Sequence, residues 1–181
     1  MMTFTAIITT ILAMAGPAEI RVPVCLKEHV AVPAPIMMSA REWAAMMFRG
    51  AGVDIRWTCG NVPDSGFRTP LVISLVSHAP DGFRPSVMAY ALPYEGVHIV
   101  IFYDRIEIAR RAETILAYVL VHEITHILEG QSRHSETGVM KARWGLDDYA
   151  RMLSRQLTFA PEDIERIHSS RGTADSPKGL P

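Results

Sequence analysis

Residues 119–144 read VLVHEITHILEGQSRHSETGVMKARW and contain the pattern His122-Glu123-x-x-His126. On an α-helix, residues four apart lie one turn apart on the same face, so the two imidazoles can reach one metal ion. Glu123 then lies beside the ion without binding it. This arrangement is typical of zinc hydrolases, in which two histidines hold the metal and the glutamate acts as general base on a water.

The residues before the motif favour a metal over ordinary packing. Residues 115–121 (ILAYVLV) are apolar on every side, which predicts a helix that is buried all round. Ionisable groups in such a helix need partners, and a metal ion would supply one. The alternative is two core histidines bonded to backbone carbonyls, with Glu123 in a salt bridge.

The chain after the motif offers a third ligand. Gly130 is suited to end the helix, because glycine takes a positive φ without a Cβ penalty. His134 follows four residues later, in a polar segment that does not continue an apolar helix. Catalytic zinc needs a third protein ligand and an open position for water.

Two nearby carboxylates are rivals of His134 as the third ligand. Glu129 lies on the same helical face as His122, but seven residues place it about 10 Å further along the axis. We therefore expect Glu129 to bond a ligand imidazole or to form a salt bridge with Arg133. Glu136 lies on the returning loop, and distance does not exclude it.

The segment resembles the metzincin metallopeptidases, which read HExxHxxGxxH followed by a turn with a methionine below the metal. Here Gly130, His134 and the turn Gly138-Val139-Met140 follow HExxH, and each of the two intervals up to His134 is one residue longer than in the family. The sequence is most similar to a group of small exported bacterial proteins with this lengthened form. In that group His-Ser and Gly-x-Met-x-x-Trp follow the helix. Here His134-Ser135 and Gly138-Val139-Met140 follow it, with three residues instead of two between Met140 and Trp144.

The resemblance implies a zinc peptidase site. One Zn²⁺ would be held by His122, His126 and His134, with Glu123 as the catalytic base and Met140 as a hydrophobic floor. A third histidine also keeps the neutral ligand set of the family.

The resemblance further implies a peptide or protein substrate. Residues 87–92 would form an edge strand that binds the substrate by backbone pairing. The candidate oxyanion donors are Tyr90, Tyr94 and Tyr103.

Two other functions compete with an exported zinc-dependent metallopeptidase. One is a non-peptidase zinc hydrolase that acts on nucleic acid, and Glu123 together with the lack of a basic patch argues against it. The other is a non-catalytic exported binding domain stabilised by its metal. A closed site with four protein ligands would favour the binding domain.

Composition is typical of one globular domain, which we expect at residues 19–168. The 181 residues are 49% hydrophobic and 20% charged, enough for a sizeable core. A net charge of −1 gives no electrostatic reason to expect nucleic acid or an anionic membrane as partner.

Residues 1–18 carry no charged side chain and contain an apolar run of signal-peptide length. We therefore expect export to the periplasm or the medium and no stable membrane association after cleavage. The alternatives are a buried N-terminal strand or an uncleaved anchor. Cys25 and Cys59 would be structural, and one disulfide is open to them in an exported protein. The Ser/Gly/Pro-rich residues 169–181 predict a disordered tail.

Alternating and apolar runs, capping boxes and turn residues define the expected elements. Strands are expected at residues 22–32, 53–58, 71–76, 87–92 and 97–103. The first helix is expected from Ser39 to Gly50 or Gly52, with Trp43, Met46 and Met47 facing the core. Further helices are expected at residues 105–111, through the HExxH motif, at 147–157 and at 161–168. This order predicts an α/β (α+β) fold: a twisted mixed sheet of about four to five strands, two main helices on it and a small helical C-terminal part.

Overall fold

The structure is a computed structural model that describes residues 20–63, 65, 67, 69–91 and 97–170. The expected signal peptide at residues 1–18 lies outside the described residues, as do Tyr94 and residues 171–181 of the expected tail. The predictions of a signal peptide, of Tyr94 as an oxyanion donor and of a disordered tail at residues 171–181 stay predictions.

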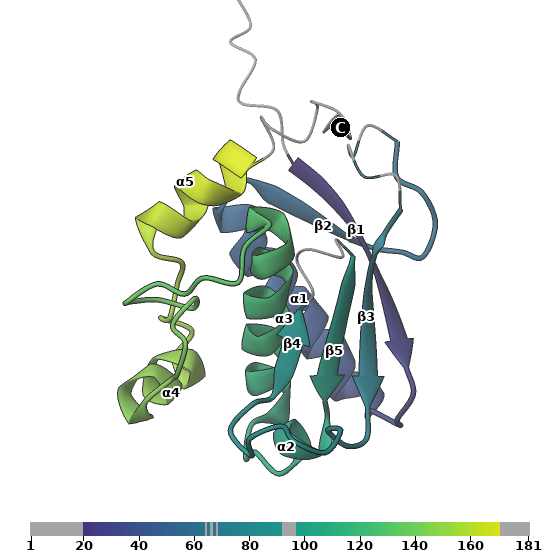
Figure 1. Cartoon of the computed structure of the whole chain (residues 1–181), viewed down its shortest axis with the longest axis vertical. Helices are drawn as coiled ribbons and strands as arrows, with labels where there is room; N and C mark the ends of the chain where they lie inside the picture. The colour runs from purple at the N-terminus through teal and green to yellow at the C-terminus, as the bar shows by residue number, and fades with distance from the viewer. Residues whose placement is uncertain (1–19, 64, 66, 68, 92–96, 171–181) are drawn as a thin grey trace, which may run out of the picture.

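Five strands form one mixed sheet in the order β2-β1-β3-β5-β4 (Figure 1). They are β1 (Ile20–Glu28), β2 (Val53–Trp57), β3 (Leu71–Val76), β4 (Ala89–Ala91) and β5 (His98–Phe102). All neighbours are parallel except β4, which runs antiparallel to β5. The predicted fold class is confirmed, and β4 is an edge strand whose outer backbone groups have no strand partner within the described sheet.

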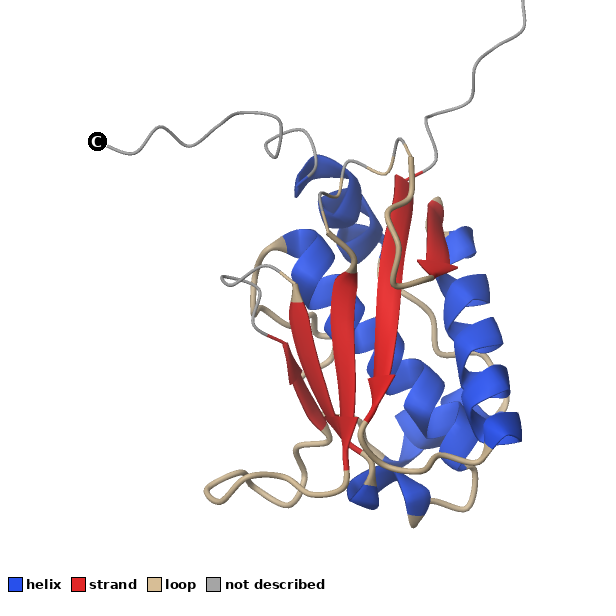
Figure 2. Cartoon of the chain, turned by 90° about the vertical axis from the view of Figure 1, so that its right-hand side faces the viewer, coloured by secondary structure: helices blue, strands red, loops and turns tan. Residues whose placement is uncertain are grey.

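Two long helices cover the sheet. α1 (Ala34–Gly50) is the crossover between the parallel strands β1 and β2, and α3 (Ala112–Glu129) follows β5. Figure 2 shows both on the same side of the sheet, where they pack against each other. Every residue of α3 from Ile115 to Glu129 is buried, so the prediction of a helix buried all round is confirmed.

The predicted start of α1 at Ser39 is wrong. The helix begins five residues earlier, at Ala34, with Pro35 in its first turn and no side-chain cap. Proline is tolerated there because the N–H it lacks would have no helical partner. Met46 is 52% exposed, so its predicted place on the core side is wrong as well, whereas Trp43 and Met47 pack partly buried against the core.

Three short helices complete the fold: α2 (Asp104–Glu107), α4 (Leu146–Leu153) and α5 (Pro161–Ser169). α2 begins at Asp104 without the predicted capping box, and it is shorter than predicted. α4 ends four residues earlier than predicted, and α5 extends to Ser169, one residue later. α4 and α5 both contact α3, so the small helical C-terminal part lies against the helix that bears HExxH.

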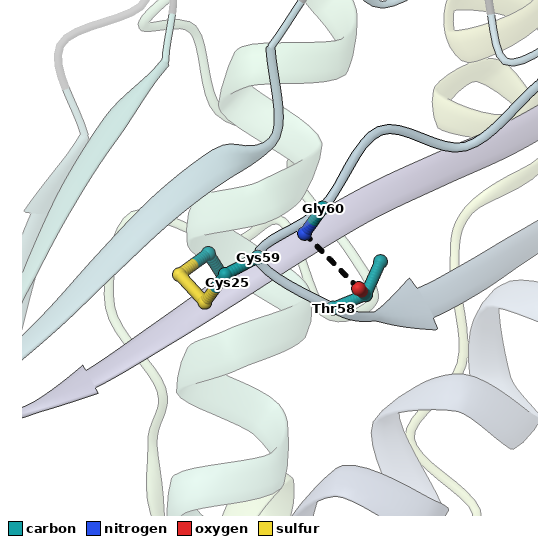
Figure 3. Close-up of a disulfide and its surroundings, with 4 residues drawn as sticks. All are labelled: Cys25, Thr58, Cys59 and Gly60. Atoms are coloured by element: carbon teal, nitrogen blue, oxygen red, sulfur yellow. Dashed lines mark hydrogen bonds between the residues drawn. A yellow bond between two sulfur atoms is a disulfide. The ribbon is translucent and has the colours of Figure 1, made fainter.

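Cys25 and Cys59 form a disulfide (Figure 3). The bridge joins β1 to the residue two positions after β2, where the Thr58 hydroxyl also accepts the Gly60 N–H at 3.1 Å. The bridge therefore closes the β1-α1-β2 unit at the edge of the sheet away from β4. In the part of the chain that the structure describes, none of the helices has the length and apolar character needed to cross a membrane.

Candidate metal centre

Three imidazoles converge at the end of α3. His122 and His126 lie one turn apart on that helix, and His134 reaches them from the loop that follows Gly130. One ring nitrogen from each lies within 4.8 Å of the others, and the Nε2 atoms of His122 and His126 are 3.1 Å apart. Nitrogens bound at about 2.0 Å to one tetrahedral zinc lie about 3.3 Å apart, so the spacing suits one ion.

Gly130 makes the return of the chain possible. It adopts φ +64° at the end of α3, and its N–H bonds the Ile127 carbonyl at 3.2 Å. The next residue, Gln131, donates its N–H back to the His126 carbonyl at 3.3 Å. The helix is thus terminated tightly enough for His134 to face the helical histidines.

Backbone carbonyls fix the tautomers of the two helical histidines. Nδ1 of His122 lies 2.9 Å from the Val139 carbonyl, and Nδ1 of His126 lies 3.1 Å from the Gln131 carbonyl. A carbonyl only accepts, so each Nδ1 must carry the proton. The Nε2 atoms of His122 and His126 then face each other with their lone pairs, which repel. A cation bound by both nitrogens would make this contact favourable.

The electrostatics keep these rings neutral. Burial, and then the neighbouring His126, lower the pKa of His122 to about 3. Burial and His134 lower the pKa of His126 to about 4. The pKa of the exposed His134 is also lowered, by partial burial and by Arg133. Neutral imidazoles are the form that binds a metal.

Glu123 is buried beside the imidazoles, with 8% of its surface exposed. Burial raises the pKa of its carboxyl to about 8. It forms no ion pair with any described residue, which disagrees with the alternative of core histidines and a salt-bridged glutamate. An uncompensated buried carboxyl is costly, and a nearby divalent cation would offset that cost.

The turn around Met140 is tied to the first histidine. Ser135 donates its N–H to the Met140 carbonyl at 2.9 Å, which closes the turn. The Val139 carbonyl accepts both from His122 and from the Trp144 indole N–H, the latter at 3.1 Å. Met140 is 1% exposed, as a floor residue would be.

Neither glutamate joins the three histidines among the described residues. Glu136 is exposed. Glu129 is 3% exposed, but both its carboxylate oxygens lack a hydrogen-bond partner, so the expected bond to an imidazole and the expected salt bridge with Arg133 are both wrong. Arg133 instead lies 3.7 Å from Asp163.

The histidines open into a cavity of about 480 Å³. Residues 86–91, which include β4, line it together with residues 141–144 and α3. Tyr90 lines the cavity and stacks on Phe83 with ring centroids 5.2 Å apart. Tyr103 is 1% exposed and does not line the cavity, so among the described candidates only Tyr90 is placed to meet a substrate.

The fold is similar to that of archaemetzincin. The crystal structure of archaemetzincin from Methanopyrus kandleri matches with a TM-score of 0.58 over 86% of this chain and 98% of that protein, at 14% sequence identity. At that identity the likeness establishes the fold alone. Comparison with models of known protein families gave no match, and comparison with curated proteins gave none either.

Three further residues of the site have no role that the sequence alone predicts. Trp144 packs edge-on against His122 with ring centroids 5.5 Å apart, and Tyr149 lines the cavity. Asp163 on α5 is fully buried and accepts a hydrogen bond from the Ser135 hydroxyl. Because Arg133 also faces Asp163, the two neighbours of His134 in the chain are held by one carboxylate.

Proposed function

We propose that this protein is an exported zinc-dependent metallopeptidase. The observation that carries the proposal is the convergence of the His122, His126 and His134 nitrogens. They line, together with the buried Glu123, a cavity that is bordered by an edge strand. The donor set suits the metal, because three neutral imidazoles are a catalytic zinc set. The archaemetzincin-like fold supports the same conclusion.

The residues divide the chemistry as follows. Zn²⁺, when bound, supplies Lewis acidity that lowers the pKa of a water and polarises the scissile carbonyl. Glu123, which faces the cavity, accepts the proton of the attacking water and then donates it to the leaving amine. The carbonyls of Val139 and Gln131 hold the rings of His122 and His126 in one orientation during these steps.

The edge strand β4 gives the substrate a place to bind. Ala89, Tyr90 and Ala91 line the cavity and pair with β5 on one side only within the described sheet. An extended peptide can add to the free side by backbone hydrogen bonds, which bind a chain of any sequence. This is why we favour a peptide or protein over another hydrolysable substrate.

The metal-stabilised binding domain is less well supported. Among the described His, Cys, Asp and Glu side chains, no fourth one joins the three histidines, whereas structural zinc sites are closed by four protein ligands. The histidines also line the cavity instead of being sealed in the core. A nucleic-acid hydrolase would leave Glu123 and the free edge of β4 without a role.

Export is part of the proposal and is supported by the disulfide. A bridge between Cys25 and Cys59 persists in an oxidising compartment and is rare in the cytosol. The uncharged residues 1–18 would be the signal that is removed.

The test compares the zinc-loaded parent with the Glu123→Gln variant on an unbiased library of peptides. The parent should cleave peptides, and the variant should lose about 10²- to 10⁴-fold in kcat/KM while it binds one zinc per chain as the parent does. Glu136→Gln, which changes an exposed glutamate of the same region, is the matched control and should keep full activity. Equal zinc loss in Glu123→Gln, or no cleavage by the zinc-loaded parent, would count against the proposal.

A further inference from the structure

Two arginines stand in the cavity lining on different segments. Arg84 lies just before the strand β4, and Arg143 lies between Met140 and α4. Both side chains are exposed, and neither forms an ion pair with a carboxylate in the part of the chain that the structure describes. They are therefore free to meet a ligand in the cavity.

The remaining charges of the lining do not neutralise these arginines. Lys141 is the third basic residue there, and its ammonium is already paired with Asp148. Glu123 is the one carboxylate among the described lining residues, and it is buried beside the histidines. With a divalent cation in place, the lining is strongly positive, although the chain as a whole has a net charge of −1.

We infer that this cleft selects peptides that carry carboxylates close to the scissile bond, with Arg84 and Arg143 as the specificity-determining residues. This inference rests on the proposed peptidase function and names the substrate class of the same site. The planar guanidinium presents a fork of donors that matches a carboxylate, and two such forks on separate segments can bind two carboxylates of one extended peptide.

The expected size of the effect follows from exposure. An exposed ion pair changes affinity only by about two- to five-fold, so each arginine should contribute that much to the preference for an acidic peptide over its amide counterpart. The preference should shrink in about 0.5 M salt, because exposed charges are screened. The positive field of the cavity adds to this and speeds association with acidic peptides.

The experiment uses the zinc-loaded protein and peptides blocked at both ends that differ only by glutamate, glutamine or lysine at positions on either side of the scissile bond. The parent should show higher kcat/KM for the glutamate peptides and lower kcat/KM for the lysine peptides. The charge-reversal variants Arg84→Glu and Arg143→Glu should each reduce this preference, and the double variant should invert it. Arg49→Glu is the matched control: Arg49 is exposed at the end of α1, does not line the cavity and should leave the preference unchanged.

A second set of peptides with a free C-terminal carboxylate separates the two sources of the carboxylate. A gain with the free terminus alone, lost in one arginine variant, would assign that arginine to the chain end. Equal kcat/KM for the glutamate, glutamine and lysine peptides, or a preference untouched by both charge reversals, would overturn the inference while the peptidase function stands.

Binding to the zinc-loaded Glu123→Gln variant gives a readout that does not need hydrolysis. Trp144 lines the cavity, so its fluorescence can report peptide binding. Glutamate peptides should bind more tightly than lysine peptides, and this order should be inverted in the variant that also carries both charge reversals. That result would support the inference even if the parent cleaved no peptide. In that case only the proposed peptidase function would fail. Equal affinity for all three peptides would contradict it.

Discussion

The bond from His122 Nδ1 to the Val139 carbonyl is the most informative contact at the scale of single residues. It joins the helix that carries the ligands to the turn that carries Met140, and it turns Nε2 toward His126. A ligand whose other ring nitrogen is held by the backbone loses little rotamer entropy when a metal binds. Position, tautomer and neutrality of the ring thus come from one hydrogen bond and from burial.

Glu129 is a buried carboxyl outside the three-histidine cluster. Burial first, and then Asp163, raise the pKa of its carboxyl from 4.5 to about 7, against the opposite effects of Arg133 and Arg166. A folded-state pKa above the unfolded one means that the contribution to stability is fully present below about pH 4.5 and is lost as the pH rises through about 7.

We therefore expect Glu129→Gln to gain stability relative to the parent as the pH rises from about 5 to 8, by at most about 2 to 3 kcal/mol. Urea unfolding at a series of pH values, with saturating zinc, measures this difference. The variant Glu136→Gln, at an exposed position of the same region, is measured beside it as the matched control. Parallel pH profiles for the parent and Glu129→Gln would mean that Glu129 finds a partner when it ionises.

At the scale of elements, the metal site depends on how the turn at Gly138 packs on the segment before α5. Gly138 has φ +75°, and a Cβ there would lie 2.7 Å from the Thr158 carbonyl oxygen and 2.9 Å from the Ala160 nitrogen. Both neighbours are backbone atoms, which cannot move aside as a flexible side chain can. The next residue, Val139, bonds Thr158 through its N–H and His122 through its carbonyl.

Gly138→Ala should therefore displace the turn and cost more than about 2 kcal/mol of unfolding free energy, together with about 10- to 100-fold in zinc affinity. Gly82→Ala is the control, because Gly82 also has a positive φ but nothing within 4 Å of the added Cβ. It should cost about 1 to 2 kcal/mol and leave zinc affinity unchanged. Urea unfolding and competition with a chelator measure the two quantities. Equal loss of zinc affinity in both variants would contradict this account.

Features that depend on neighbouring residues in the chain are the ones that a sequence can predict. The helix of HExxH and its end at Gly130 were predictable, because apolar residues and a left-handed glycine act locally. The start of α1 was not predictable, since Ser39 and Glu42 form a plausible capping box. Met37, two residues before Ser39, is buried in the core, and the helix extends back to Ala34. Local patterns therefore compete with tertiary packing, and packing prevails.

The same limit applies to the site. The His122, His126 and His134 cluster follows from spacing on a helix and a short return loop. The contact of Ser135 with Asp163 spans 28 residues, and no periodicity brings α5 to the metal loop. The wrong expectation for Glu129 has the same origin, because Arg133 turns toward Asp163, which the sequence could not place.

At the scale of the whole molecule, the two edges of the sheet have different roles. The side of β4 carries the site, while β2 at the other edge is joined to β1 by the Cys25–Cys59 bridge. The bridged residues are 34 positions apart and enclose the whole of α1. Closing a loop of that length removes unfolded-state entropy worth about 3 to 4 kcal/mol.

We expect the Cys25→Ser, Cys59→Ser double variant to lose about that much unfolding free energy and to bind zinc as the parent does, because the bridge lies away from the histidines. Urea unfolding with and without reductant measures the loss, and the reductant should have no effect on the double variant.

Intact mass of exported protein should show a chain that starts between residues 16 and 19 with the bridge formed. Two free thiols in that material would refute the bridge, and an intact Met1 would refute cleavage of residues 1–18.

The most direct test of the three-histidine zinc centre is X-ray absorption at the zinc edge on the zinc-loaded protein. We expect three imidazole nitrogens and one water oxygen at about 2.0 to 2.1 Å from the zinc, and one histidine fewer in His134→Ala. Glu136→Ala should leave the spectrum unchanged. A fourth protein ligand in place of the water, or a loss of ligation in Glu136→Ala and not in His134→Ala, would contradict it.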